Sequence, residues 1–322
     1  MNYPKGVSGL VNIGNTCYLN SAIQLLSCIP EIQQIFLETN LKNKLLKEFE
    51  HDKSKKKILT LEFMKILHNL HNEQCIVKPT SFKKILSIVN NDYIGNSQHD
   101  SCEFLMYLID CLHESIHYEV NINYSGQPEN LRDKLMIESI KSWSSNFSND
   151  YSPLINLFYG QFKITLMKKR SKIFNFNPFN IINLSINDCN TIYECFDKFI
   201  QNEDIDHKDY DKKYERLWRL PKYLLIDFKR FNNNKKLTHF VDFPINNLDL
   251  EKYTDSYDKL NCKYNLKGVI YHIGNLNFGH YYCITKINNI WFEFNDEDFS
   301  IVKSINKIVN NNAYVLLYER LN

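Results

Sequence analysis

Apolar residues recur with a helical period in the first part of the chain. From Cys17 onward they fall on one face of a helix, at Leu19, Ala22, Ile23 and Leu26. Pro30 cannot continue a helix, so this helix is expected to end before it. Asn15 and Thr16 precede Cys17 and offer side chains that can cap the first turn. The pattern therefore predicts that Cys17 lies in the first turn of a helix.

Two later segments repeat this spacing. The first carries its apolar face at Leu59, Phe63, Ile66, Leu67 and Leu70. The second follows Gln98 and carries its apolar face at Phe104, Leu108, Cys111 and Leu112. Ser97 and Asp100 can form a cap at the start of this second segment. The first half of the chain is thus predicted to be helical.

The character of the chain changes from Leu154 onward, where β-branched and aromatic residues become frequent. Residues 220–231 form an apolar run typical of a buried strand. Further strands are predicted at 264–273, 280–287, 290–295 and 313–318. Asn288 and Asn289 join two of them, and asparagine tolerates the positive φ of a tight hairpin turn. An antiparallel β region after a helical half makes the predicted fold class α+β.

The Asn288–Asn289 turn fixes a register that can be tested. If Ile287 pairs with Ile290, opposite residues have numbers that sum to 577. His280 and Asn295 then become diagonal neighbours on one face, roughly 7–8 Å apart between Cα atoms. Asp296 is expected to point to the other face. The register therefore predicts that Asn295 orients His280.

Composition narrows the class of protein. The 322 residues include 39 Lys+Arg and 37 Asp+Glu, a net charge of +2, so no global field points to nucleic acid or an anionic membrane. Nine cysteines without regular spacing favour a reducing compartment. Residues 1–8 do not resemble a signal peptide, and no apolar run approaches the ~20 residues of a membrane span. We expect an intracellular protein of the cytoplasm or nucleus, and the cell can be a host cell.

Cys17, His280 and Asn295 follow one another in an order that suits nucleophilic catalysis. At a helix N-terminus, unpaired N–H groups and the positive end of the dipole favour thiolate over thiol. A cysteine nucleophile needs a general base within hydrogen-bond reach, and that base needs a third group to hold its tautomer. The alternative is that Cys17 is a small buried hydrophobe and His280 a packed histidine.

The residues around Cys17 favour catalysis. This stretch resembles the Cys box of the ubiquitin-specific proteases, a family of papain-like deubiquitinating enzymes. The matching residues are Gly9, Leu10, Asn12, Gly14, Asn15, Thr16, Cys17, Tyr18, Asn20, Ser21, Gln24 and Leu25. A dozen matches in so short a window are unexpected by chance.

Later motifs resemble the same family in the same order. The segment from Gln98 resembles the motif Q-x-D-x-x-E-F-L, residues 157–161 the F-x-G turn, and residues 264–296 the His box. In the family, acidic residues of the second motif receive the arginine-bearing C-terminal tail of ubiquitin, a strong carboxylate–guanidinium pairing. The resemblance implies that the substrate is contacted by Gln98, Asp100, Glu103, Gly279 and Tyr281.

The resemblance also implies roles for the candidate catalytic residues. Cys17 is the implied nucleophile, His280 the base, and Asn295 the orienting residue. Asn12 matches the family's oxyanion-stabilising Asn, since an amide supplies a neutral donor where negative charge develops. Asp296 is implied to assist by a second contact or by stabilising the oxyanion. A structural alternative for Asn12 is a local turn with the nearby glycine.

One family feature is missing from the sequence. Members commonly carry two CxxC pairs that hold a zinc ion. Only Cys189 and Cys195 lie in the corresponding interval, and the first pair is replaced by Lys168–Ser171. A structural zinc site needs four N or S ligands, so we predict no zinc, and the resemblance implies no other cofactor.

The resemblance implies a right-hand architecture in a single catalytic domain over residues 6–319. The helical thumb is expected at about 6–150, and the antiparallel β palm and fingers at about 154–319. The implied function is hydrolysis of isopeptide or peptide bonds after the C-terminal glycine of ubiquitin, through a Cys-His-Asn triad and a thioester acyl-enzyme. Implied partners are ubiquitin and ubiquitinated proteins, with no nucleic acid and no membrane, and we expect a monomer.

Two alternatives stay open at this point. One is a ubiquitin-binding module without turnover, and the other is a protease for a different ubiquitin-like modifier. The loops 274–279 and 232–239 are predicted to be mobile gates over the tail-binding channel.

Overall fold

A computed structural model of the chain describes residues 3–52, 54–72, 76–168, 171–201, 203–207, 210–232, 235–256, 262–275 and 278–321. The chain divides into two compact units. The first unit is Met1–Ile116, Phe231–Thr238 and Lys267–Leu316, and the second is His117–Arg230, His239–Leu266 and Leu317–Asn322. Within the described ranges, no helix combines the length and the apolar character needed to cross a membrane.

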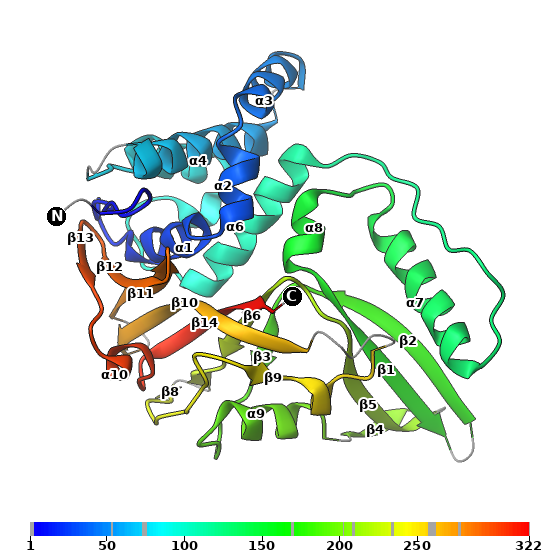
Figure 1. The fold of residues 1–322 in the computed structure, drawn as a ribbon. Helices are drawn as coiled ribbons and strands as arrows, with labels where there is room; N and C mark the ends of the chain where they lie inside the picture. The colour runs from blue at the N-terminus through cyan, green and yellow to red at the C-terminus, as the bar shows by residue number, and fades with distance from the viewer. Residues whose placement is uncertain are drawn as a thin grey trace. The chain divides into compact units, whose positions relative to one another are not determined.

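Helices form the N-terminal part of the first unit (Figure 1). They are α1 (Cys17–Ser27), α2 (Pro30–Phe36), α3 (Thr39–Asp52), α4 (Lys55–Asn72), α5 (Thr80–Val89) and α6 (Ser101–Ile116), with a 3₁₀ turn at Asn91–Tyr93. The predicted apolar faces of α1, α4 and α6 are buried, and in α1 every residue is buried. As predicted, α1 ends before Pro30, which instead opens α2.

The later part of the first unit is a sheet with the strand order β13-β12-β11-β10-β14. Its strands are β10 (Lys263–Gly274), β11 (Gly279–Ile287), β12 (Ile290–Asn295), β13 (Asp298–Ile301) and β14 (Ala313–Arg320), and β10 and β14 continue into the second unit. The unit also holds β7 (Phe231–Asn232), β8 (Lys235–Lys236) and the short helix α10 (Ile305–Ile308). All strands predicted from the C-terminal sequence pattern are present.

The predicted hairpin register is confirmed. β11 and β12 are antiparallel and pair from Ile287 with Ile290 to Cys283 with Phe294, so that every pair sums to 577. Asn288 and Asn289 have φ angles of +48° and +64°, the left-handed conformation that a two-residue hairpin turn requires.

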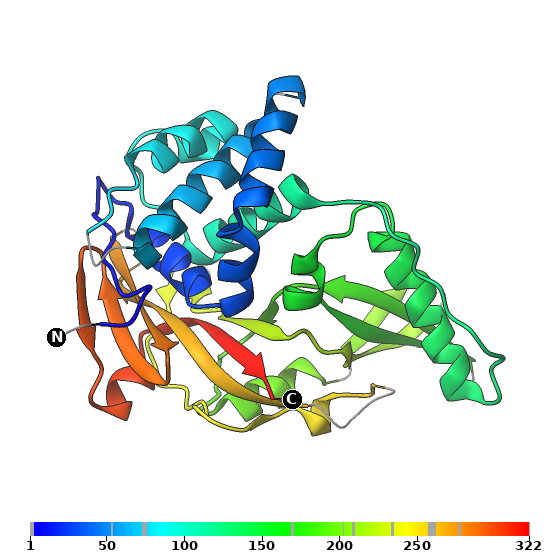
Figure 2. The same ribbon diagram turned by 45° about the horizontal axis from the view of Figure 1, so that its top comes forward.

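The helix α1 packs on this sheet. It contacts β11 and β12 on one side and α6 on the other, and Figures 1 and 2 both show it beside these elements. Gly268 on β10 permits the close approach, because a Cβ there would lie 2.6 Å from Leu25 Cδ1. The packing brings an N-terminal helix beside strands more than 250 residues later in the chain.

The second unit is built on two sets of strands. One sheet has the order β2-β1-β5-β4, and β3 pairs with β6 in parallel. The strands are β1 (Gly160–Lys168), β2 (Ser171–Phe179), β3 (Ile182–Leu184), β4 (Glu203–His207), β5 (Tyr210–Arg219), β6 (Tyr223–Phe228) and β9 (Leu248–Asp249). The helices are α7 (Leu131–Phe147), α8 (Pro153–Phe158), α9 (Ile192–Phe199) and a 3₁₀ turn at Glu251–Tyr253. The predicted buried strand corresponds to β6.

The compact units cut across the predicted thumb boundary near residue 150. Helices up to Ile116 share a unit with the strands of Lys267–Leu316 because α1 packs directly on β11 and β12. The single domain over 6–319 stays a prediction. So do the two predicted gates, since residues 233, 234, 276 and 277 lie outside the described residues.

Candidate active site

Cys17 is the first residue of α1, as predicted, and is 4% exposed. The chain enters the helix through a left-handed turn, with φ angles of +113° at Gly14 and +52° at Asn15. The Thr16 carbonyl then accepts hydrogen bonds from the N–H groups of Leu19 and Asn20, at 3.1 and 3.0 Å. The Cys17 side chain therefore projects from the positive end of a buried helix.

The predicted side-chain caps of α1 do not form. Thr16 occupies the capping position, but its Oγ1 accepts from the Ile13 N–H at 3.0 Å instead. Asn15 Nδ2 donates to the Asn96 carbonyl at 2.7 Å. The turn directs both side chains away from the first-turn N–H groups, so no capping side chain offsets the positive end of α1.

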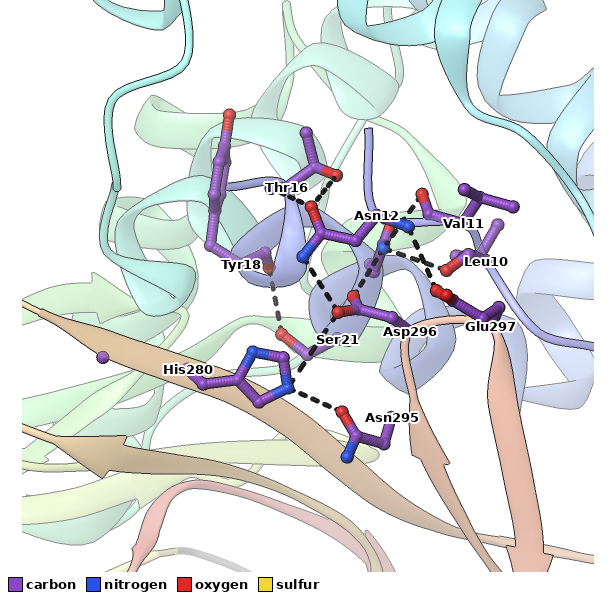
Figure 3. A network of polar contacts seen from close by, with 12 residues as sticks. Leu10, Val11, Asn12, Thr16, Tyr18, Ser21, His280, Asn295, Asp296 and Glu297 are labelled. Carbon is purple, nitrogen blue, oxygen red and sulfur yellow. Dashed lines mark hydrogen bonds and ion pairs between the residues drawn. The ribbon is translucent and has the colours of Figure 1, made fainter. Parts of the chain in front are cut away.

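His280 and Asn295 meet at the ends of β11 and β12, as the register predicted. His280 Nε2 donates to Asn295 Oδ1 at 2.6 Å (Figure 3). A proton on Nε2 leaves the lone pair of a neutral imidazole on Nδ1. Nδ1 is therefore the nitrogen that can accept a proton from Cys17.

The surroundings of His280 favour its charged form. A hydrogen bond with the Cys17 side chain is the main cause that raises the pKa of His280 from 6.5 to about 9. Burial acts in the opposite direction, while the bond to Asn295 and the charges of Cys17 and Asp296 add to the rise. An imidazolium at this position is the product of proton transfer from Cys17 to His280.

Asp296 corrects one prediction, because it does not point to the face opposite His280. Its Oδ2 lies 3.9 Å from His280 Nε2, and its side chain is 11% exposed. Asp296 follows the last residue of β12 and has a φ of +53°, within a tight turn that leads to β13. Side chains alternate only along extended backbone, so the prediction failed where the strand ended.

The Asp296 carboxylate and carbonyl are the centre of a polar network (Figure 3). Oδ2 accepts from Asn12 Nδ2 at 2.9 Å, and Oδ1 accepts from Asn20 Nδ2 at 2.8 Å. The Asp296 backbone carbonyl accepts from the Leu10 N–H at 2.8 Å. The turn after β12 is thereby joined to the segment before α1 and to α1 itself.

Asn12 forms the local turn that was the structural alternative. Its Oδ1 accepts from the N–H groups of Gly14 and Thr16, both at 3.1 Å. Its Nδ2 donates to Asp296, so the amide is fixed in one orientation. A side-chain amide carries two N–H donors, and the predicted oxyanion role of Asn12 stays a prediction.

Asn20 is a site residue to which sequence reasoning gave no role. It lies three residues after Cys17, is 2% exposed, and donates to Asp296. The available signal was a side-chain amide three residues after Cys17 in a helix rich in apolar residues, where an unpartnered buried amide would be costly.

Among the five predicted substrate contacts, Gln98 and Gly279 lie together. Gln98 Nε2 donates to the Gly279 carbonyl at 2.8 Å, and the Gly279 N–H donates to Gln98 Oε1 at 3.0 Å. This pair of bonds fixes the backbone beside His280. Tyr281 is 7% exposed and its pKa is raised by burial, so its side chain lies below the surface of the site.

Asp100 and Glu103 differ in how far their carboxylates already take part in hydrogen bonds within the chain. Asp100 caps α6, as predicted, by accepting from the N–H groups of Cys102 and Glu103 at 2.7 and 3.0 Å, and it also accepts from the Tyr314 hydroxyl at 2.6 Å. The Glu103 side chain is exposed, and its pKa is raised by partial desolvation and then by the charge of Asp100. A cation beside Glu103 would relieve this repulsion.

The described residues contain no group of three or more His, Cys, Asp or Glu side chains that could hold a metal ion. Cys189 and Cys195 are both buried thiols. Two residues of the replaced CxxC pair, 169 and 170, lie outside the described residues, so the absence of zinc stays a prediction.

Comparison with known proteins places this geometry in a family. The family model described as ubiquitin carboxyl-terminal hydrolase matches residues 8–318. Ubiquitin carboxyl-terminal hydrolase Usp2 of Drosophila melanogaster is 30% identical over 339 residues, which cover 98% of this chain and 35% of the relative. Human ubiquitin carboxyl-terminal hydrolase 2 is 29% identical over 343 residues, 98% of this chain and 55% of the relative. The chain thus spans about a third to about a half of the length of these relatives.

Solved structures share the α+β fold. The SAGA DUB module of Ubp8, Sgf11, Sus1 and Sgf73 bound to monoubiquitin matches with a TM-score of 0.77 and 22% identity, covering 100% of this chain and 71% of the matched chain. A structure of the same module matches with a TM-score of 0.74 and 26% identity, covering 100% and 69%. Since the family model spans nearly the whole sequence and the fold agrees, this chain belongs to the ubiquitin carboxyl-terminal hydrolase family, as a relative of the ubiquitin-specific proteases.

Proposed function

We propose that this chain is a cysteine-type deubiquitinase that hydrolyses isopeptide or peptide bonds after the C-terminal glycine of ubiquitin. Family membership supports the reaction class. The observation that carries the proposal is the position of His280, which interacts with the Cys17 side chain and donates from Nε2 to Asn295. This is the nucleophile, base and orienting group that thiol catalysis needs.

In the proposed mechanism, His280 Nδ1 takes the proton of Cys17 as the sulfur attacks the carbonyl of the terminal glycine. The S–C bond forms, the tetrahedral oxyanion collapses, and the C–N bond breaks as His280 protonates the leaving amine. Water, activated by His280, then cleaves the thioester. Asn295 accepts from Nε2 and so holds the ring of His280 in one orientation, and Asn12, fixed by Asp296, is the proposed donor to the oxyanion.

The proposed substrate recognition uses the exposed carboxylate of Glu103 for a tail arginine. Asp100 shares its carboxylate with α6 and Tyr314, so its proposed role is to reinforce the negative charge beside Glu103. The Gln98–Gly279 pair supplies rigid backbone next to His280. A matched structure contains monoubiquitin, and ubiquitin is the partner we propose here. A monomer stays our prediction.

The test is turnover of a fluorogenic ubiquitin C-terminal substrate by the wild type and two cysteine variants. Cys17→Ala is expected to abolish turnover, because no thiol remains at the end of α1. Cys28→Ala is the matched control, since Cys28 is also buried and caps the other end of α1. It is expected to retain activity within about threefold.

Three outcomes would contradict the proposal. Turnover by Cys17→Ala would exclude Cys17 as the nucleophile. Ubiquitin binding by the wild type without turnover would indicate the binding module. Faster cleavage of a different ubiquitin-like modifier, measured with the matching fluorogenic substrate, would reassign the substrate.

A further inference from the structure

Asn20 occupies an unusual environment in α1, a helix in which every residue is buried. Its Nδ2 faces three acceptors, Asp296 Oδ1 at 2.8 Å and the carbonyls of Leu10 and Val11 at 3.1 and 3.4 Å. These acceptors belong to the turn after β12 and to the segment before α1. One amide NH₂ therefore connects α1 with the turn after β12 and with the segment before α1.

The other end of the same amide is left without a partner. Asn20 Oδ1 is buried and has no hydrogen-bond partner among the described residues, although the side chain is only 2% exposed. A buried acceptor without a donor costs free energy. Rotating the amide would place Oδ1 against two carbonyls and a carboxylate, which is worse. The three acceptors therefore require a donor at the position of Asn20 Nδ2, and this orientation of the amide leaves Oδ1 unpaired.

We propose that Asn20 is a positioning residue that holds the Asp296 carboxylate toward His280 and Asn12. This inference rests on the proposed deubiquitinase function, in which His280 is the base. Without the Asn20 donor, Asp296 Oδ1 would lose the hydrogen bond that it now shares with the carbonyl oxygens of Leu10 and Val11. Repulsion would turn the carboxylate away from its 3.9 Å approach to His280 Nε2 and its 2.9 Å bond to Asn12.

The titratable groups that face His280 come from several elements. Cys17 faces it from α1 and Asp296 from the turn after β12. His272, on β10, is buried and neutral, since burial, Lys236 and His280 lower its pKa to about 4. Asp296 is therefore the carboxylate acting on the imidazole, and Asn20 acts on His280 only through it.

The test is a double-mutant cycle between Asn20→Ala and Asp296→Ala. Alone, Asn20→Ala is expected to lower kcat on the order of ten- to a hundredfold, with KM changed by less than about threefold. In the Asp296→Ala background the same substitution is expected to have almost no further effect on kcat. Additive losses would overturn the proposal, because they would mean that Asn20 acts independently of Asp296.

Gln24 provides a matched control on the same helix. It is also 2% exposed, and its Nε2 donates to the Ser8 carbonyl at 2.7 Å without contacting Asp296. Gln24→Ala is expected to keep kcat within about threefold and to show no coupling to Asp296→Ala. If Asn20→Ala does not fold, Asn20→Ser retains one donor and is expected to recover part of the activity. A Gln24→Ala loss equal to that of Asn20→Ala would indicate a general packing role.

A second readout needs no ubiquitin. NMR titration of the His280 ring in the full chain is expected to show a lower pKa in Asn20→Ala than in the wild type, and an unchanged pKa in Gln24→Ala. An unchanged pKa in Asn20→Ala would overturn the positioning role. If Asn20→Ala shows this lower pKa but the wild type does not cleave ubiquitin substrates, the proposed function is refuted and the positioning role of Asn20 still stands.

Discussion

His280 is a residue whose charge depends on its partners. Burial lowers its pKa, yet the contact with Cys17, the bond to Asn295 and the nearby Asp296 carboxylate together outweigh that effect. Since the hydrogen bond with the Cys17 side chain is the largest contribution, the pKa of His280 depends on that side chain. Removing the Cys17 thiol is therefore expected to change the pKa of the imidazole.

This linkage predicts the effect of removing the sulfur. Cys17→Ala is expected to lower the pKa of His280 from about 9 by roughly one unit or more, because the main cause of the rise is lost while burial remains. NMR titration of the ring measures it. The folded pKa lies above the unfolded value of 6.5, so the stabilising contribution of His280 is present below about pH 6.5 and is lost as the pH rises through about 9. Between these pH values, urea unfolding should show a smaller loss of stability in Cys17→Ala than in the wild type. Equal losses of stability in the two proteins would contradict the dependence of His280 on Cys17.

At the scale of elements, the segment before α1 is fixed between other parts of the first unit. The carbonyl of Gly9 accepts from the Val77 N–H and the N–H of Val11 donates to the Val77 carbonyl, both at 2.9 Å. On its other side, Leu10 donates to the Asp296 carbonyl. A Cβ added at Gly9 would lie 2.0 Å from the Glu297 carbonyl oxygen, so the segment and the turn after β12 can approach only because residue 9 is glycine.

We therefore expect Gly9→Ala to destabilise the protein by about 1–3 kcal/mol, since backbone must move to relieve the overlap. Activity should fall together with stability, because the displaced turn carries Asp296. Urea denaturation and ubiquitin turnover measure the two effects. Gly95→Ala is the control: Gly95 has a φ of +77° but open space around its Cβ position, so only backbone strain of about 1 kcal/mol is expected and activity should be retained. A loss of activity in Gly95→Ala as large as that in Gly9→Ala would contradict the crowding argument.

At the scale of the whole molecule, charge is nearly balanced. A net charge of +2 gives no strong field to attract or repel a substrate. The proposed recognition of a cationic tail would then depend on local carboxylates, and Glu103 is an exposed carboxylate at the predicted tail site. The pKa of Glu103 is raised by desolvation and, to a smaller extent, by repulsion from Asp100, and a bound guanidinium would offset that repulsion.

Glu103→Gln is expected to raise KM for a ubiquitin substrate about tenfold with kcat nearly unchanged, because one charged hydrogen bond in binding is weakened. Steady-state kinetics measure this. Glu38→Gln is the control, since Glu38 is an exposed residue of the first unit and its substitution changes net charge by the same amount. Binding by the wild type should weaken as the pH falls through the raised pKa of Glu103. A similar KM for both variants would show that total charge, and not this carboxylate, governs recognition.

Sequence alone determined the local elements of the first unit and much of its chemistry. Helical spacing placed Cys17 at the start of α1, and the Asn288–Asn289 turn fixed a register that brought His280 beside Asn295. These predictions succeeded because helix and hairpin geometry depend on residues close together in the chain. The α+β class followed from the same periodicities, whereas the division into compact units did not.

Tertiary structure decided what happens where regular elements end. Asp296 turns back toward His280 because it has left the strand, and the Thr16 side chain turns away from the helix because Gly14 and Asn15 adopt positive φ. The role of Asn20 depends on a carboxylate 276 residues later in the chain. Periodicity describes side chains only within a repeating backbone, and contacts between distant segments arise from packing, which is why these features became visible only in the folded chain.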